Sequence, residues 1–352
     1  MTGSPHDSPS PSTDSDPIDS DPTGADPTRS DPTGSSGSVA PSAPDNGPAL
    51  TRAEFDALFD SVCAWGRWTP RQADRGAWNR VGPDHVRRAA ALVRTGTTVP
   101  MALPWNTVPG PDNGKPALHY MSELGDIEAP EPTCHKDFIA VDYHGKGVSH
   151  LDALSHIAYR GQLYDGRTAV EVVDAKGAHF GAVSSLGPLV TKGVLIDMPA
   201  VLGTDWLQPG KAVHAAEVLA AETALGVTIG EGDAVLLRSG RFRRRRELGP
   251  WNPDDASAGF HVDVMPLLAE RGIALLGGDG DSDVRPSPVE GVSSPVHALA
   301  ITAMGVPLLD NLDLEALSAA CAEADRYEFM FTVAPLNVPG GTGSPVNPVA
   351  VL

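Results

Sequence analysis

Cysteine is scarce in this sequence, which has three cysteines among its 352 residues. Cys63, Cys134 and Cys321 are odd in number and far apart, and none of them belongs to a CxxC pair. This pattern does not fit the disulfide framework of a small secreted protein. We therefore expect a protein of the reducing cytoplasm, in which the three thiols are buried apolar groups.

Other common features are missing as well. No uninterrupted apolar run is long enough to cross a bilayer, so a membrane partner is not expected. Basic residues number 26 against 45 acidic ones, and the net charge of −19 argues against nucleic acid as the main partner. The GxSxG motif of serine hydrolases is also absent, which disfavours a serine nucleophile.

The first 47 residues differ in composition from the rest of the chain. They are mostly Ser, Pro, Asp, Thr and Gly, with short Asp-Pro-Thr repeats and almost no large apolar residue. Such a segment cannot offset the entropy cost of ordering by burying apolar surface. It also lacks the basic and apolar regions of a signal peptide. We predict a disordered leader over residues 1–47 and one folded domain over residues 48–352.

Predicted strands and helices alternate along this domain, which indicates a mixed α/β fold. A capping box at Thr51 and Glu54 begins a first helix, and a second helix begins near Asp84. Strands are expected at 98–103, 137–143, 193–198, 233–238, 273–276 and 327–333. Further helices are expected at 213–225, 262–270, 297–304 and 314–323.

The residues best suited to chemistry lie between Asp142 and His156, where three histidines and two aspartates fall within fifteen residues. Imidazole and carboxylate groups together suit Zn²⁺, Mn²⁺ or iron. If a helix begins near His150, then Asp152 and His156 lie four residues apart on one helix face. A carboxylate between two imidazoles could also bridge two ions. The alternative is a set of independent surface or core histidines.

The segment 142–156, followed by Gly161-Gln-Leu-Tyr-Asp-Gly166, resembles the signature of the metal-dependent cyclase family. This family includes bacterial kynurenine formamidase and isatin hydrolase. Further matches follow in order, at 232–240, 274–279 and 334–350, the last of which is similar to the ending of the longer members. The resemblance covers residues 106–352. It implies a single swivelling β/β/α-type domain with a mixed sheet core and flanking helices, and a homo-oligomer.

The resemblance also implies a set of metal ligands. They fall on His150, Asp152 and His156, and are joined from the distant half of the chain by His297 and Asp310. Asp310 departs from the family pattern, because the late acidic ligand is typically Glu and the aspartate side chain is shorter by one methylene.

A second departure concerns the first ligand. In formamidases that ligand lies four residues before the second, where this sequence has Lys146. His144 then becomes the substitute, from six residues back. The resemblance therefore implies Zn²⁺ or Mn²⁺ and leaves open whether one or two ions bind.

A bound divalent metal lowers the pKa of water and polarises a carbonyl. The resemblance thus implies hydrolysis of a C–N bond beside a carbonyl in a small molecule, as in the arylformamidase step of tryptophan catabolism. His156 and His297 would be ligands if two ions bind, or catalytic acid/base groups if only one does. Two alternatives are cyclase or lactone hydrolase chemistry in secondary metabolism, and a non-catalytic small-molecule-binding protein with a structural metal.

Two further residues are weaker candidates for substrate contacts. A histidine occupies a place comparable to His261 in the longer family members, and Trp105 could supply an apolar wall of the kind that small-molecule sites have.

Two charged runs are interpreted as structural and not as parts of a binding site. The arginines of 241–246 are expected in a solvated loop. The acids Asp279, Asp281 and Asp283 lack the glycine that a calcium-binding loop needs, so we expect them to shape a loop between core elements.

Overall fold

The computed structural model describes residues 46–125 and 131–352, which belong to one compact unit. The leader predicted over residues 1–47 lies outside the described residues, except for its last two positions, so its disorder stays a prediction. Within the two described ranges, every helix falls short of the length or the apolar character that spanning a bilayer requires.

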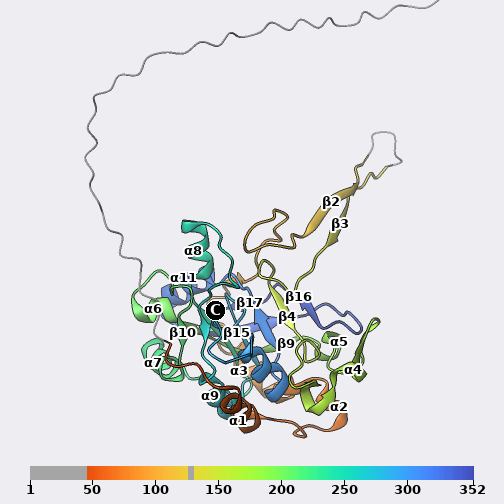
Figure 1. The fold of residues 1–352 in the computed structure, drawn as a ribbon. Helices are drawn as coiled ribbons and strands as arrows, with labels where there is room; N and C mark the ends of the chain where they lie inside the picture. The colour runs from red at the N-terminus through yellow and green to blue at the C-terminus, as the bar shows by residue number, and fades with distance from the viewer. Residues whose placement is uncertain (1–45, 126–130) are drawn as a thin grey trace, which may run out of the picture. The chain divides into compact units, whose positions relative to one another are not determined.

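A nine-stranded mixed sheet lies at the centre of the fold (Figure 1). The four central strands, β9, β11, β13 and β14, run parallel to one another, and the sheet continues antiparallel on either side of them. The predicted mixed α/β fold is confirmed. Across the sheet the strands are β1 (Thr98–Pro100), β17 (Val349–Val351), β15 (Glu328–Val333), β9 (Leu189–Asp197), β11 (Ala234–Arg238), β13 (Leu275–Gly278), β14 (Leu308–Asp310), β4 (His150–Asp152) and β16 (Gly343–Pro345).

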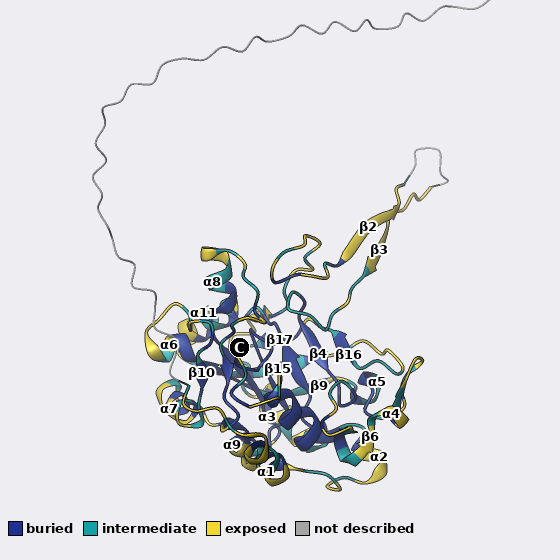
Figure 2. Ribbon diagram, in the orientation of Figure 1, coloured by how far each residue is buried: buried dark blue, intermediate teal, exposed yellow. Residues whose placement is uncertain are grey.

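Within the described ranges, four pairs of short strands lie outside this sheet. The β2–β3 hairpin projects from the body of the fold, and its residues are almost all exposed (Figures 1 and 2). The β10–β12 pair is parallel, whereas the other three pairs are antiparallel. The pairs are β2 (Leu118–Glu123) with β3 (Lys136–Ala140), β5 (Gln162–Leu163) with β6 (Arg167–Thr168), β7 (Val173–Asp174) with β8 (Gly177–Ala178), and β10 (Ala212–Val213) with β12 (Gly259–Phe260).

Helices flank the sheet, and the first of them begins as its sequence predicts. The Thr51 hydroxyl accepts the Glu54 N–H, and the Glu54 carboxylate accepts the Thr51 N–H in return. The α-helices are α1 (Arg52–Val62), α2 (Pro70–Ala73), α3 (Pro83–Ala90), α4 (Ala169–Val172), α5 (Val183–Leu186), α6 (Met198–Leu202), α7 (Ala215–Leu225), α8 (Arg241–Leu248), α9 (Val264–Arg271), α10 (Pro295–His297) and α11 (Glu315–Ala324). The described residues also form two 3₁₀ helices, η1 (Gly76–Arg80) and η2 (Tyr164–Gly166), and one π-helix, η3 (Ala298–Met304).

Apolar side chains form two cores, one on each face of the sheet. Val194 and Ile196 of β9 belong to one core, and Leu195 between them belongs to the other. This division arises because successive side chains of a strand point to opposite faces. Helices α1, α7 and α9 contribute to the first core and α11 to the second. The central strands β11, β13 and β14 are buried on both faces (Figure 2).

The arginine run 241–246 is helical, so the prediction of a solvated loop there was wrong. The carboxylate of Asp279 accepts the backbone N–H of Arg241 at the start of α8, along with the two preceding N–H groups. Arg241 itself is buried and donates to the Asn311 side chain at 2.6 Å. Both partners lie far away in sequence, so charge density alone could not indicate them.

Candidate metal centre

Strands β4 and β14 bring three of the predicted ligands together. His150 and Asp152 are two residues apart in β4, so their side chains point to the same face. In the antiparallel pairing, His150 lies directly opposite Asp310 of β14. The prediction of a helix beginning near His150 is therefore wrong. The segment is a strand, and its period of two puts His150 and Asp152 on the same face. All three residues are at least 97% buried.

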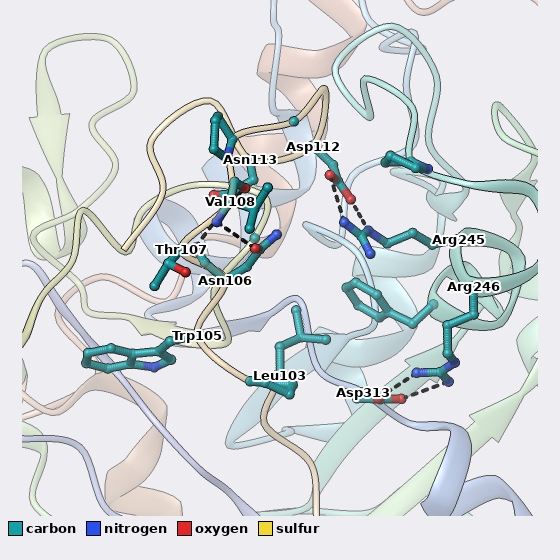
Figure 3. Close-up of a pocket in the computed structure, with 16 residues that line it drawn as sticks. Leu103, Trp105, Asn106, Thr107, Val108, Asp112, Asn113, Arg245, Arg246 and Asp313 are labelled. Atoms are coloured by element: carbon teal, nitrogen blue, oxygen red, sulfur yellow. Dashed lines mark hydrogen bonds and ion pairs between the residues drawn. The ribbon is translucent and has the colours of Figure 1, made fainter. Parts of the chain in front are cut away.

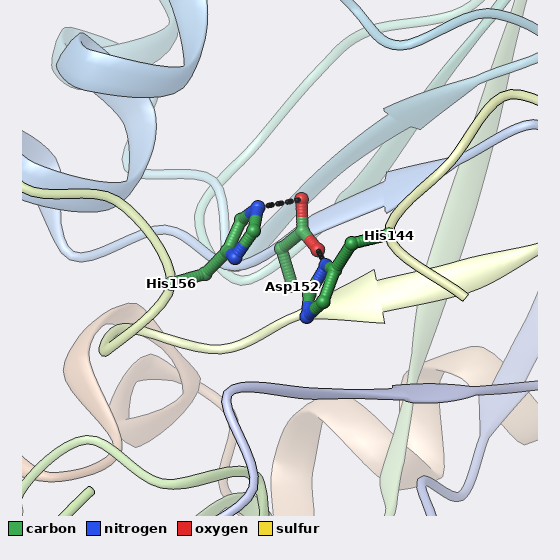
Figure 4. A group of neighbouring side chains, drawn as sticks. All are labelled: His144, Asp152 and His156. Carbon is green, nitrogen blue, oxygen red and sulfur yellow. Dashed lines mark ion pairs between the residues drawn. The ribbon is translucent and has the colours of Figure 1, made fainter. Parts of the chain in front are cut away.

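Two further histidines approach the Asp152 carboxylate from the loops on either side of β4 (Figure 4). His144 Nδ1 lies 2.8 Å from Asp152 Oδ1, and His156 Nε2 lies 3.8 Å from Asp152 Oδ2. The two imidazole rings are stacked, with centroids 3.8 Å apart and an interplanar angle of 3°. His144, which the sequence offered only as a substitute ligand, thus lies with the others.

His297 completes the cluster from the distant half of the chain, at the point where α10 leads into η3. Its Nε2 lies 3.3 Å from Asp310 Oδ2 and 3.6 Å from Asp152 Oδ2. On the other side of the ring, Nδ1 lies 2.6 Å from Asp283 Oδ2. A carboxylate in this position sets the orientation of the imidazole.

The burial of Asp152 provides a test of whether these residues fit a metal ion. Both of its carboxylate oxygens are buried and accept no aligned hydrogen bond from residues 46–125 and 131–352. A buried charge without such partners is costly, and a bound cation removes the cost. Because the donors are imidazoles and carboxylates, they suit Zn²⁺ or Mn²⁺.

Asp152 also belongs to two groups of three potential ligands. Within each group one donor atom per residue lies within 4.8 Å of the others. A carboxylate shared in this way can contact one ion or bridge two, so the geometry is compatible with either number. The groups are His144, Asp152 and His156, and His150, Asp152 and Asp310.

Mutual electrostatics perturb the titration of these groups. Burial alone would raise the pKa of Asp152, but the surrounding imidazoles hold it well below its usual range. Burial lowers the pKa of His156 to about 4, which keeps this ring neutral and its lone pair free. For His297, burial is outweighed by neighbouring carboxylates, Asp310 foremost, and the pKa is raised well above its usual value.

The cluster borders a cavity of about 140 Å³. Lys146 and Arg285 form part of its wall and both pair with Asp281, the arginine at 2.8 Å. Lys146 occupies the position where the family pattern expects a ligand. A lysine ammonium group has no acceptor lone pair, so in this ion pair Lys146 is not a metal ligand.

The family model for cyclases matches residues 102–282, which is more than half of the chain and includes β4 with its two metal-ligand candidates. The chain belongs to the cyclase family. No curated protein matches it.

Several solved structures share the fold of this chain. A crystal structure described as a novel cyclase is 27% identical, covers 84% of this chain and 99% of its own, and superposes with a TM-score of 0.76. An isatin hydrolase bound to the product analogue thioisatinate is 19% identical, covering 75% of this chain and 94% of its own with a TM-score of 0.51. Isatin hydrolase A from Ralstonia solanacearum is 20% identical, with coverages of 75% and 93% and a TM-score of 0.51. The two isatin hydrolases support the fold alone.

Sequence reasoning missed two residues that shape this cyclase-family site. Asp283 was interpreted as a loop-shaping acid, but its carboxylate holds His297 in place. Asn311 directly follows Asp310, and its amide donates to the carbonyls of Gly145 and Val148 at 2.8 and 3.3 Å, which fixes the loop before β4. No local pattern distinguishes these residues, because Asp283 contacts a histidine 14 residues further on and Asn311 contacts carbonyls 166 and 163 residues away.

Two candidates for substrate contact lie away from the cavity. Trp105 lines a separate cavity of about 620 Å³, between the loop 103–110 and α8 (Figure 3). Gly147 forms part of that wall, one residue after Lys146 of the metal-centre cavity. His261 follows β12 and pairs with Asp263. The structure therefore does not bring either residue to the predicted ligands, and their contact with substrate stays a prediction.

Proposed function

We propose that this cyclase-family protein is a metal-dependent hydrolase that cleaves a C–N bond beside a carbonyl, in an amide, formamide or lactam. The observation that carries this proposal is the buried Asp152 carboxylate, whose oxygens lie among four imidazoles and accept no aligned hydrogen bond from the described residues. The proposed ligands are His150, Asp152 and Asp310, with His144 and His156 on the cavity side. Zn²⁺ or Mn²⁺ is the proposed ion.

A bound ion would supply a more acidic water and a polarised substrate carbonyl. Residues of the chain would supply proton transfer and substrate orientation. His297 is fixed by Asp283 through Nδ1 and presents Nε2 to the ligand carboxylates and the cavity. It can therefore hold or deliver a proton at Nε2, as a general acid or base does. Lys146 and Arg285 also line the cavity and can orient a polar substrate group.

The position of the cavity supports catalysis over a purely structural metal. Structural zinc sites are normally closed by four protein ligands. Here the side chains of His144 and His156 are 22% and 24% exposed and line the cavity directly. A small molecule can therefore reach the proposed ligands.

Metal analysis combined with substrate assays tests this function. We expect the purified full-length protein to hold one or two equivalents of divalent metal per chain. It should hydrolyse N-formylkynurenine, isatin or both, lose this activity in EDTA and regain it with Zn²⁺ or Mn²⁺. A simple lactone is assayed beside them. Lactone turnover without C–N cleavage would favour the lactone hydrolase alternative. A metal-free protein that remains active, or a His150→Ala variant as fast as the parent, would contradict the proposal.

Asp283 has a predicted effect of its own, as a positioning residue. In Asp283→Asn the amide group would donate to His297 Nδ1 and so force the ring proton onto Nε2. We expect kcat/KM to fall by roughly 10–100-fold, as for other partners of active-site histidines. The pH profile should shift at the same time, while the bound metal changes less than in a ligand variant.

Asp205→Asn is the matched control, because Asp205 is 60% exposed and pairs with Arg243 on the surface. Its kinetics should equal those of the parent. An Asp283→Asn variant with the parent's kcat/KM and pH profile would show that the carboxylate does not position His297 for the reaction.

A further inference from the structure

A second group of metal-ligating side chains lies at the end of the β10–β12 pair. These strands are parallel, so the residues that follow them emerge at the same edge. His214 follows β10 and His261 follows β12, and the His261 N–H donates to the Val213 carbonyl at 2.9 Å. Asp263 lies two residues further on, at the start of α9. Strand pairing thus places two imidazoles and a carboxylate side by side.

Both rings turn the same nitrogen toward one carboxylate oxygen. His214 Nδ1 lies 2.8 Å from Asp263 Oδ2, and His261 Nδ1 lies 3.2 Å from the same atom. The ring centroids are 4.3 Å apart. One donor atom from each of the three residues lies within 4.8 Å of the others.

Hydrogen bonding leaves His261 incompletely satisfied. Its Nδ1 accepts the Asp263 N–H at 3.3 Å, so in the neutral ring this nitrogen cannot also donate to the carboxylate. An acceptor nitrogen and an ionised carboxylate oxygen then face each other at 3.2 Å, which a cation between them would stabilise. The side chain is 91% buried, and its Nε2 has no hydrogen-bond partner in the part of the chain that the structure describes.

One oxygen of the Asp263 carboxylate faces both imidazole rings. Asp263 Oδ1 accepts the Ala215 N–H at 3.1 Å, while the His214 N–H donates to Glu217 at 2.9 Å. Carboxylates thus accept the backbone N–H groups at the start of α7, and Asp263 Oδ2 contacts the two imidazole rings.

We propose that His214, His261 and Asp263 form a second divalent-cation site, distinct from the metal centre at Asp152. Two imidazoles and one carboxylate suit Zn²⁺ best among the common ions. None of the three residues lines the metal-centre cavity. The side chains of His214 and Asp263 are 28% and 45% exposed, so an ion can enter and water can complete its coordination. An ion here would join the start of α7 to the start of α9.

Zinc titration of a full-length chain that lacks the first site tests this proposal. We would prepare Asp152→Asn, strip it with EDTA, and titrate it with Zn²⁺ by calorimetry, with metal analysis after dialysis. One equivalent is expected to remain bound. Adding His214→Gln should weaken this binding by at least roughly tenfold and abolish the rise in Tm that Zn²⁺ causes. Asp263→Asn, which keeps an oxygen for the Ala215 N–H, should do the same.

His179→Gln is the matched control, because His179 pairs with Asp174 on the surface and is 59% exposed. In the Asp152→Asn background it should leave the zinc isotherm unchanged. The proposal is overturned if that background binds no Zn²⁺, or if its affinity is the same with and without His214→Gln and Asp263→Asn. Hydrolytic activity does not enter this readout, so the outcome is independent of the proposed function.

Discussion

Asp152→Asn is expected to empty the metal centre at β4 and to lower kcat/KM by more than about 100-fold, since loss of an outer partner of a metal ligand alone costs roughly 10–100-fold. The carboxylate lies in both ligand groups and is close to His144, His150, His156 and His297. An asparagine of the same shape carries no charge and offers a single acceptor oxygen. Its amide group would also point a donor at an imidazole nitrogen or at the ion.

Metal content by mass spectrometry and initial rates on the responsive substrate measure the two effects separately. Asp142→Asn is the matched control, because it makes the same chemical change ten residues earlier, at a side chain that is 51% exposed and paired with Lys115. The control should keep the parent's metal and rate. An Asp152→Asn protein that retains full metal and at least half of the activity would refute the role given to this residue.

Arg238→Met is expected to lower the free energy of unfolding by about 3–5 kcal/mol, because removing one partner of a buried ion pair leaves the other charge uncompensated. Arg238 ends β11 and is 94% buried as a side chain. It donates to Asp197 at 2.8 Å and to Glu315 at 2.7 Å, so it connects two sheet strands and α11. Methionine fills a similar volume but leaves the fully buried Asp197 without its cation.

Urea unfolding followed by circular dichroism measures this loss as a lower midpoint at an unchanged slope. The control is Arg243→Met, because Arg243 is 42% exposed and forms surface pairs with Asp205 and Glu247. Such pairs contribute about 0–1 kcal/mol. If Arg238→Met unfolds within about 1 kcal/mol of the parent, the buried pair does not stabilise the fold as argued.

Much of the secondary structure could be predicted because its signals are local. The capping box at Thr51 begins α1, and the apolar runs at 233–238 and 327–333 coincide with β11 and β15 to within one residue at each end. Hydrophobic periodicity and capping act over a few residues, so a single sequence carries them. The segment at His150 was different, because a three-residue strand is too short to show any period.

Lys146 illustrates the limit of a pattern carried over from a family. Its position suggested a missing ligand, and the sequence offered His144 as the substitute. The structure shows where both side chains go: His144 contacts Asp152, while Lys146 pairs with Asp281 on the cavity wall. Asp281 lies 135 residues away from Lys146, and no spacing rule connects them.

The sequence by itself determined the chemistry available to this protein: the imidazoles and carboxylates at 144–156, His297 and Asp310, and a family resemblance that the cyclase match confirms. Tertiary structure alone decided how they meet. Strand pairing sets Asp310 opposite His150, and the His297 ring is aimed by Asp283. The physical reason is that ligand type is a property of each residue, whereas distance and orientation depend on how segments that are separate in the sequence pack together.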